Sequence, residues 1–140
     1  MTTFYYRLTN AYNGPSFSLD VVGGTTDLTI AATGNFTGQY WKLVPVTNSP
    51  GKFYLRTQYK GDEYSLDITN DASKTPHLAQ TGNYTGQYWT LTRDGDAFKL
   101  SNDFTGASTF LDVYSDQMKP RLATGNTTGM HWTFTLVEIQ

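Results

Sequence analysis

Several features that would direct a search for function are missing from this chain. None of its 140 residues is cysteine, which excludes disulfides and thiolate metal sites. The net charge is −2 and no Lys/Arg-rich run occurs, so we expect no binding to nucleic acid. No apolar run is long enough to span a membrane, and residues 1–7 do not form a secretion signal. These absences predict a cytoplasmic protein that does not insert into membranes.

Catalytic motifs are missing as well. The chain has only two histidines, and we expect His77 in a polar loop and His131 facing outward from a strand. There is no Gly-x-Ser-x-Gly, no His-Glu-x-x-His and no phosphate-binding loop. The sequence therefore predicts a protein that is not an enzyme and that uses neither a metal nor a cofactor.

The residues that are abundant favour β structure. Thr, Tyr, Phe and Gly are common, whereas Ala and Glu are sparse. β-Branched and aromatic residues favour strands, and Gly and Asn favour the turns between them. No segment shows the apolar spacing of a helix, so an all-β fold is predicted.

Three copies of one sequence unit fill the chain. Each copy holds a leucine-aspartate step and, after it, a Thr-Gly-Asn segment that leads to a tryptophan. The steps are Leu19-Asp20, Leu66-Asp67 and Leu111-Asp112, at offsets of 47 and 45 positions, and the later segments are 33–41, 81–89 and 124–132. Repeated units of this kind bury their apolar faces by closing together. We place their boundaries near 1–49, 50–94 and 95–140, within a single domain.

Each unit is expected to contribute about four short strands, so that about twelve strands close into one all-β domain. In the first unit these strands are predicted near residues 5–9, 17–22, 28–32 and 39–46. The repeated leucines and tryptophans are assigned to the core. A second aromatic set, followed two positions later by glycine, is predicted to anchor hairpin turns: Tyr12, Tyr59 and Phe104.

A threefold Leu-Asp step followed by a Gln-x-Trp strand resembles the ricin-B-like (R-type) lectins, and most nearly their small cysteine-free mushroom members of the bolete type. Residues 39–41 and 87–89 match the Gln-x-Trp motif in full, while 130–132 keep only the tryptophan. Gly38 and Gly86 stand where plant members have asparagine, which indicates a rearranged loop. The resemblance implies a β-trefoil, in which three hairpins cap a six-stranded barrel.

The resemblance also implies partners. It predicts metal-independent binding of galactose or N-acetylgalactosamine, including Gal-GalNAc glycans, at up to three equivalent sites. Several sites on one rigid domain would make the protein a multivalent agglutinin with a role in defence. A homodimer would multiply the sites further, and the aromatic content is the only sign of one in the sequence.

A neutral sugar presents hydroxyl pairs and a patch of C–H groups, so its binder needs a carboxylate, an amide and an aromatic face. Each of the first two units holds all three within 17 positions of its aspartate. The third unit has a threonine at the aromatic position, so its site is predicted to be weaker or altered. The assigned residues are Asp20, Asn35 and Phe36 in the first unit, Asp67, Asn83 and Tyr84 in the second, and Asp112, Asn126 and Thr127 in the third. By resemblance, the backbone at Gly23, Asn70 and Ser115 also contacts the sugar.

Other interpretations stay open at this point. Each aspartate could instead satisfy backbone N–H groups of its own hairpin. Each asparagine fits the N-glycosylation pattern and is also a residue that tolerates a left-handed turn. For the whole protein, one alternative is a β-trefoil protease inhibitor, which would need one distinctive loop rather than three similar ones. Another is a carbohydrate-binding module detached from an enzyme.

Overall fold

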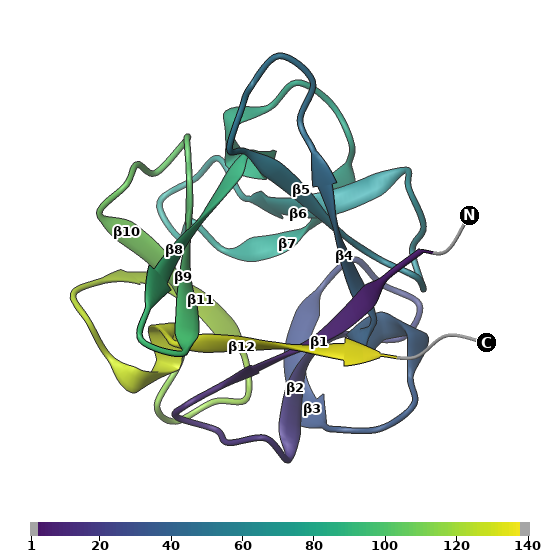
Figure 1. Cartoon of the computed structure of the whole chain (residues 1–140), viewed down its shortest axis with the longest axis vertical. Coiled ribbons are helices and arrows are strands. Elements are labelled where there is room, and N and C mark those ends of the chain that lie inside the picture. Colours follow the sequence, from purple (N-terminus) through teal and green to yellow (C-terminus); the bar gives the residue numbers. More distant parts are fainter. Residues whose placement is uncertain (1–2, 138–140) are drawn as a thin grey trace.

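Twelve β-strands in three groups of four form the framework of residues 3–137, which the structure, a computed structural model, describes (Figure 1). The first group is β1 (Tyr5–Asn10), β2 (Phe17–Val21), β3 (Leu28–Ala32) and β4 (Trp41–Pro45). The second is β5 (Phe53–Thr57), β6 (Tyr64–Ile68), β7 (Pro76–Gln80) and β8 (Trp89–Asp94). The third is β9 (Ala97–Asn102), β10 (Thr109–Val113), β11 (Pro120–Thr124) and β12 (Trp132–Val137).

The first and fourth strands of each group close a barrel in the order β1-β12-β9-β8-β5-β4. The second and third strands pair as antiparallel hairpins, β2 with β3, β6 with β7 and β10 with β11. In Figure 1 the three hairpins lie behind the barrel strands, arranged around a common axis. This arrangement is a β-trefoil, and it confirms the predicted fold. Barrel closure also joins β1 to β12, so the third unit packs against the first.

One turn of 3-10 helix precedes the last strand of each unit. These turns are η1 (Thr37–Gln39), η2 (Thr85–Gln87) and η3 (Thr128–Met130). The sequence placed Gln39 at the start of a strand, which is wrong, because its backbone N–H donates to the Phe36 carbonyl at 2.9 Å and not to a neighbouring strand. The turn directs the Gln39 side chain inward, where it is fully buried. Nothing helical within residues 3–137 has the length and apolarity that a bilayer crossing requires.

The core is formed by the repeated apolar residues. Trp41, Trp89 and Trp132 are at most 1% exposed, and the leucines of the Leu-Asp steps are fully buried. Each indole Nε1 donates to the carbonyl of its own unit's leucine at 3.0 Å. The prediction that these tryptophans are structural is confirmed, and replacing one by alanine is expected to destabilise the fold by about 3–5 kcal/mol.

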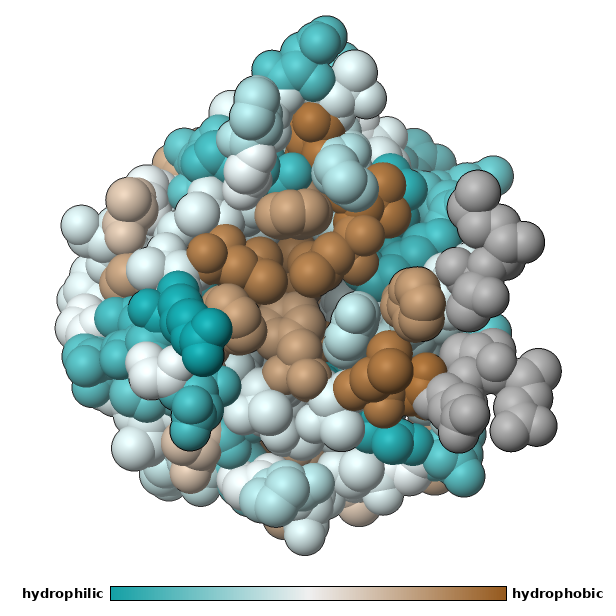
Figure 2. Space-filling model, in the orientation of Figure 1, coloured by the Kyte–Doolittle hydropathy of each residue, from teal (hydrophilic) through white to brown (hydrophobic). Residues whose placement is uncertain are grey.

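The core reaches the open end of the barrel. Partly buried apolar residues of the barrel strands, among them Leu43 on β4 and Phe134 on β12, pack against it. Figure 2 shows apolar residues gathered near the middle of this barrel end, with hydrophilic residues around them. The rings of Phe98 and Phe134 meet edge to face, with centroids 5.9 Å apart, which fixes the packing there.

Candidate functional site

Two hollows occupy equivalent places in the first and second units. The hollow in the first unit, site 1, has a volume of about 440 Å³, and that in the second, site 2, about 350 Å³. All the residues that the sequence assigned to these two units line them. Site 1 contains Asp20, Gly23, Asn35 and Phe36, and site 2 contains Asp67, Asn70, Asn83 and Tyr84.

In each of sites 1 and 2, the aspartate carboxylate accepts from two donors, and the donors are equivalent in the two units. Asp20 Oδ1 accepts from the Val21 backbone N–H at 2.7 Å, and its Oδ2 accepts from Gln39 Nε2 at 3.1 Å. Asp67 repeats this arrangement with Ile68 and Gln87 at the same distances. A carboxylate has about four acceptor positions, so each half-buried aspartate can accept further hydrogen bonds. The aspartates therefore stabilise their own hairpins and still offer acceptors to a ligand.

A glycine lies directly behind each carboxylate. A Cβ atom added at Gly38 would lie 2.4 Å from Asp20 Oδ1, and one added at Gly86 would lie 2.4 Å from Asp67 Oδ1. Any side chain at these positions would push the carboxylate out of place. This contact gives the physical reason for glycine where the sequence departs from the plant lectin pattern.

The asparagine amides of sites 1 and 2 accept hydrogen bonds at their carbonyl oxygens. Asn35 Oδ1 accepts from Arg7 Nη2 at 2.7 Å and from the Tyr40 hydroxyl at 3.4 Å. Asn83 Oδ1 accepts from the Tyr88 hydroxyl at 3.4 Å. Asn35 Oδ1 thus accepts two hydrogen bonds and Asn83 Oδ1 one, and the two amide nitrogens can donate to a ligand hydroxyl. That these amides both donate to and accept from a sugar stays a prediction.

Each site has an exposed aromatic face. Phe36 is 58% exposed and Tyr84 is 59% exposed. Both rings lie against the backbone of a glycine, because a Cβ added at Gly34 or Gly82 would lie 2.5 Å from the ring. A ring supported in this way presents its other surface to solvent with little freedom to move, as stacking on a sugar requires.

Sequence reasoning missed a second ring at each site, which comes from the following unit. Tyr59 lines site 1 and Phe104 lines site 2, with 43% and 39% of these residues exposed. The Tyr59 hydroxyl accepts from the Gly24 backbone N–H at 2.8 Å, which ties the ring to site 1. Both residues lie in turns that lead from a barrel strand into a hairpin, β5 to β6 and β9 to β10, so the prediction that they anchor hairpin turns is wrong. Their periodic recurrence was the only signal in the sequence.

The third unit differs from the first two because its aspartate carboxylate is buried and is not open to solvent. Asp112 is only 2% exposed, and Val113 N–H donates to its Oδ1 at 2.8 Å. Its Oδ2 accepts from Arg121 Nη2 at 3.3 Å and from Thr127 Oγ1 at 3.1 Å. Met130, which replaces the glutamine of the other units, makes no such bond. The remaining hollow, site 3, measures about 190 Å³ and leaves Asp112 little capacity to accept from a ligand.

The other assigned groups of the third unit are also engaged. Asn126 Oδ1 accepts from His131 Nε2 at 2.7 Å, the role that a tyrosine hydroxyl has in the other units. Ser115 lines site 3, but its carbonyl accepts from the Tyr12 hydroxyl at 2.8 Å. Tyr12 itself lines site 3, as Tyr59 lines site 1.

The histidines lie apart from any metal-binding cluster. His77 belongs to β7, opposite Asp67 on β6, so the expectation that it lies in a loop is wrong. His131 immediately precedes β12, with its Nε2 3.4 Å from Asp94 Oδ2. Within residues 3–137, no group of three or more potential metal ligands comes together.

No protein-family model matches this chain. No curated protein matches it by sequence. Solved structures do match it in fold, at identities of 13–24%, so the likeness concerns the fold alone. ThreeFoil, a designed 3-fold symmetric protein, is 24% identical with a TM-score of 0.75, and the match covers 96% of this chain and 99% of that one. SeviL, bound to asialo-GM1 saccharide, is 16% identical with a TM-score of 0.73, over 95% of this chain and 97% of that one.

Other matches are parts of larger proteins. A mosquitocidal holotoxin matches with a TM-score of 0.83 at 13% identity, over 99% of this chain, and the chain spans 18% of its length. The chain spans 33% and 31% of two glycosidases that also match. The fold is therefore the β-trefoil, which also occurs in the Polyporus squamosus lectin and as a part of a holotoxin and of two glycosidases.

Proposed function

We propose that this protein is a lectin that binds glycans ending in galactose or N-acetylgalactosamine, including the Gal-GalNAc type, without a metal. The observation that carries the proposal is the arrangement of sites 1 and 2. Each joins one supported carboxylate, one amide donor and two aromatic rings around a hollow of about 440 or 350 Å³. The same groups recur in two units, which a single inhibitory loop would not require.

The chemistry of the two sites suits a neutral sugar. Asp20 and Asp67 accept from paired hydroxyls, and the amide nitrogens of Asn35 and Asn83 donate to a neighbouring hydroxyl oxygen. The exposed rings cover the apolar C–H face of the sugar. A monosaccharide has few atoms and competes with water, so we expect a Kd on the order of 0.1–1 mM for each site.

Multivalency would then supply useful affinity on a glycan-dense surface. Two sites on one rigid domain can bind the same surface together, which raises the overall avidity without any new contact. Pairing of two chains would double the number of sites. We propose on this basis that the protein acts as an agglutinin, with defence as its role.

Catalysis fits the geometry less well than binding does. A glycosidase needs two carboxyl groups that flank one glycosidic bond. Asp20 and Asp67 lie in separate units and each serves its own hollow. Among the structural neighbours, SeviL is bound to a saccharide, and the glycosidases contain this fold as about a third of their chains. We therefore propose binding and not hydrolysis, whether the domain acts alone or as a carbohydrate-binding module.

Calorimetric titration with galactose, N-acetylgalactosamine and the Gal-GalNAc disaccharide tests the proposal. For galactose we expect two sites per chain and the same result after treatment with EDTA. Asp20→Ala combined with Asp67→Ala should remove galactose binding, while Asp96→Ala, at an exposed turn, should leave it unchanged. Absence of binding to all three sugars by the wild type, or inhibition of trypsin or papain, would contradict the proposal.

A further inference from the structure

A larger hollow lies where the third unit meets the first. Its volume is about 560 Å³, against 440 and 350 Å³ for sites 1 and 2. It lies between the β10–β11 loop, residues 114–119, and the β1–β2 turn of the first unit. We call it the seam pocket, and its wall is formed chiefly by Tyr12, Asn13, Phe17, Tyr114, Asp116 and Met118.

The loop that forms one side of the seam pocket is held in place by the first unit. The Tyr12 hydroxyl donates to the Ser115 carbonyl at 2.8 Å. The Met118 carbonyl accepts from the Ile30 backbone N–H at 2.8 Å and from Thr29 Oγ1 at 2.9 Å. These bonds fix the loop before any ligand arrives, and a preformed site loses less entropy on binding.

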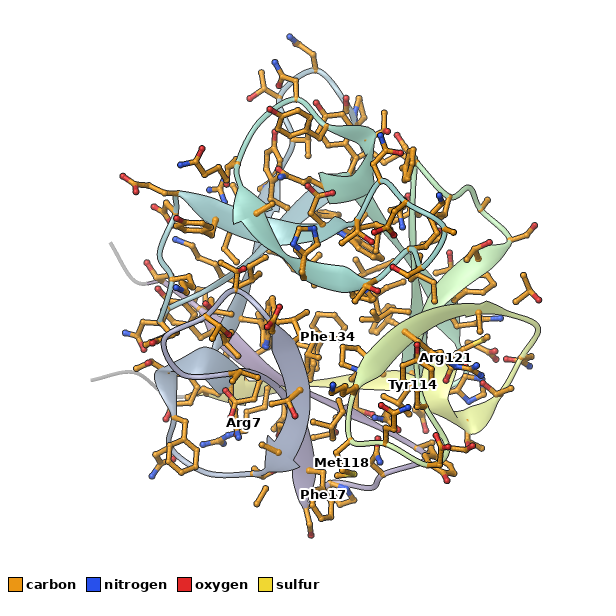
Figure 3. All side chains as sticks on the ribbon, turned by 180° about the vertical axis from the view of Figure 1, so that it is seen from behind. Arg7, Phe17, Tyr114, Met118, Arg121 and Phe134 are labelled. Carbon is orange, nitrogen blue, oxygen red and sulfur yellow. The ribbon has the colours of Figure 1, made fainter. Side chains whose placement is uncertain are left out.

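The walls of the seam pocket are unusually apolar for a surface. Tyr12, Phe17, Tyr114 and Met118 are 36–49% exposed. Figure 3 shows Phe17 and Met118 close together, with Tyr114 beside Arg121. Exposed large apolar residues grouped around one hollow are a sign of a binding site.

One residue of this wall, Met118, has a different counterpart at the next junction. The Thr26 carbonyl accepts from the Leu78 backbone N–H at 2.9 Å, as the Met118 carbonyl accepts from Ile30. Met118 therefore takes the place that Thr26 has in the first unit. A threonine in that place presents a hydroxyl and one methyl group where the seam presents a long thioether.

Polar groups stand beside the apolar wall. Asp116 and Gln117 are exposed and line the pocket, supplying a carboxylate and an amide. Asn13 Oδ1 accepts from Asn10 Nδ2 at 2.8 Å, which leaves the Asn13 amide nitrogen with only the weak acceptor Met118 Sδ at 3.9 Å. The seam pocket thus combines an acceptor, amide donors and an apolar surface, while the Asp112 carboxylate of the neighbouring site 3 is closed.

We propose that the seam pocket binds the acetamido group of an N-acetylated hexosamine, a proposal that rests on the lectin function above. An acetamido group has an N–H donor, a carbonyl acceptor and a methyl group. The Asp116 carboxylate accepts from the N–H, the amide nitrogens of Asn13 and Gln117 donate to the carbonyl, and Phe17 and Met118 cover the methyl. The third unit thus contributes a site of different specificity at the seam, in place of a third galactose site.

Titrations on the Asp20→Ala and Asp67→Ala double variant test this site in the absence of sites 1 and 2. We expect one site per chain for N-acetylgalactosamine and at least tenfold weaker binding of galactose. Adding Met118→Thr, which copies Thr26, should weaken the remaining site at least fivefold, and adding Asp116→Asn at least tenfold. Asp96→Asn is the matched control for a remote exposed carboxylate and should change nothing.

A second measurement covers the case in which the double variant does not fold. In the wild type, N-acetylgalactosamine should shift the backbone amide NMR signals of residues 114–118, and galactose should not. If the wild type binds galactose at two sites but these signals do not move, the seam proposal is wrong and the lectin proposal stands. If the signals move with N-acetylgalactosamine while galactose binds nowhere, the galactose sites are wrong and the seam site stands.

Discussion

The third unit provides a natural experiment for Gln39, because it has Met130 at the equivalent position. Gln39 is fully buried and makes three hydrogen bonds, to Asp20 Oδ2 at 3.1 Å, to the Ala32 carbonyl at 2.8 Å and from the Gly34 N–H at 3.0 Å. Met130 is fully buried too, so a thioether fits the space. The change Gln39→Met therefore removes polar contacts while the volume of the side chain is kept.

The expected loss follows from these contacts. Three hydrogen bonds at about 1 kcal/mol each give about 3 kcal/mol, and burial of an apolar thioether in place of the amide recovers about 1 kcal/mol. We therefore expect the free energy of unfolding to fall by about 2 kcal/mol and Tm by about 6 °C. Asp20 loses the donor that orients it, so the affinity of site 1 for galactose should fall about tenfold.

Urea unfolding followed by tryptophan fluorescence measures the stability, and calorimetry measures the binding. A triple variant is the control, in which Thr29→Arg and Phe36→Thr accompany Gln39→Met and copy the Arg121 and Thr127 contacts of the third unit. The triple variant should recover stability, because the Asp20 carboxylate again has hydrogen-bond partners. It should not recover binding, because those partners occupy the acceptor positions that the sugar would use. A loss in Gln39→Met below about 0.5 kcal/mol would refute this account of the glutamine.

Three further outcomes are expected. Phe36→Thr should weaken galactose binding at site 1 about tenfold by calorimetry, with Tm almost unchanged because the ring is 58% exposed; an equal loss of stability would place the ring in the core. Arg121→Thr should lower the free energy of unfolding by about 2 kcal/mol in urea, since it leaves the buried Asp112 carboxylate without its charged partner; an unchanged midpoint would contradict the pairing. The hydrogen bond from Lys42 holds the pKa of Asp62 below its usual value of 3.8, so the pair stabilises the fold above about pH 4 and the stabilisation is lost as the pH falls through the lowered value. Asp62 is 68% exposed and screened by solvent, so Lys42→Met should reduce stability by at most about 0.5 kcal/mol at pH 7, and the difference should vanish near about pH 2.

The features that the sequence predicted correctly are those built within one unit. The strands, the buried tryptophans and the positions of Asp20, Asn35 and Phe36 all follow from a hairpin and the segment after it. These residues are at most 17 positions apart, so the local turn and strand alternation place them together. The start of the fourth strand was misplaced by two residues, because a 3-10 turn there precedes Trp41.

The features that the sequence could not predict depend on strand register within a hairpin or on how the units close. Tyr59 reaches site 1 from the next unit, and its hydroxyl bonds a backbone group 35 positions away. Arg121 closes site 3 because its side chain lies across the hairpin from Asp112, a pairing that depends on strand register. The seam pocket joins residues 103 positions apart, as in the bond from Tyr12 to Ser115.

The sequence alone determined a threefold β domain with a leucine and tryptophan core and two sets of an aspartate, an asparagine and an aromatic residue that line equivalent hollows, because periodic local patterns specify strands, turns and the groups they carry. Strand pairing within the third hairpin decided that the third carboxylate is closed by Arg121. Barrel closure decided which ring completes each site and that a wider apolar pocket opens at the seam. These contacts join residues that lie far apart along the chain. The spacing of a sequence pattern does not specify which distant residues become neighbours in the folded protein.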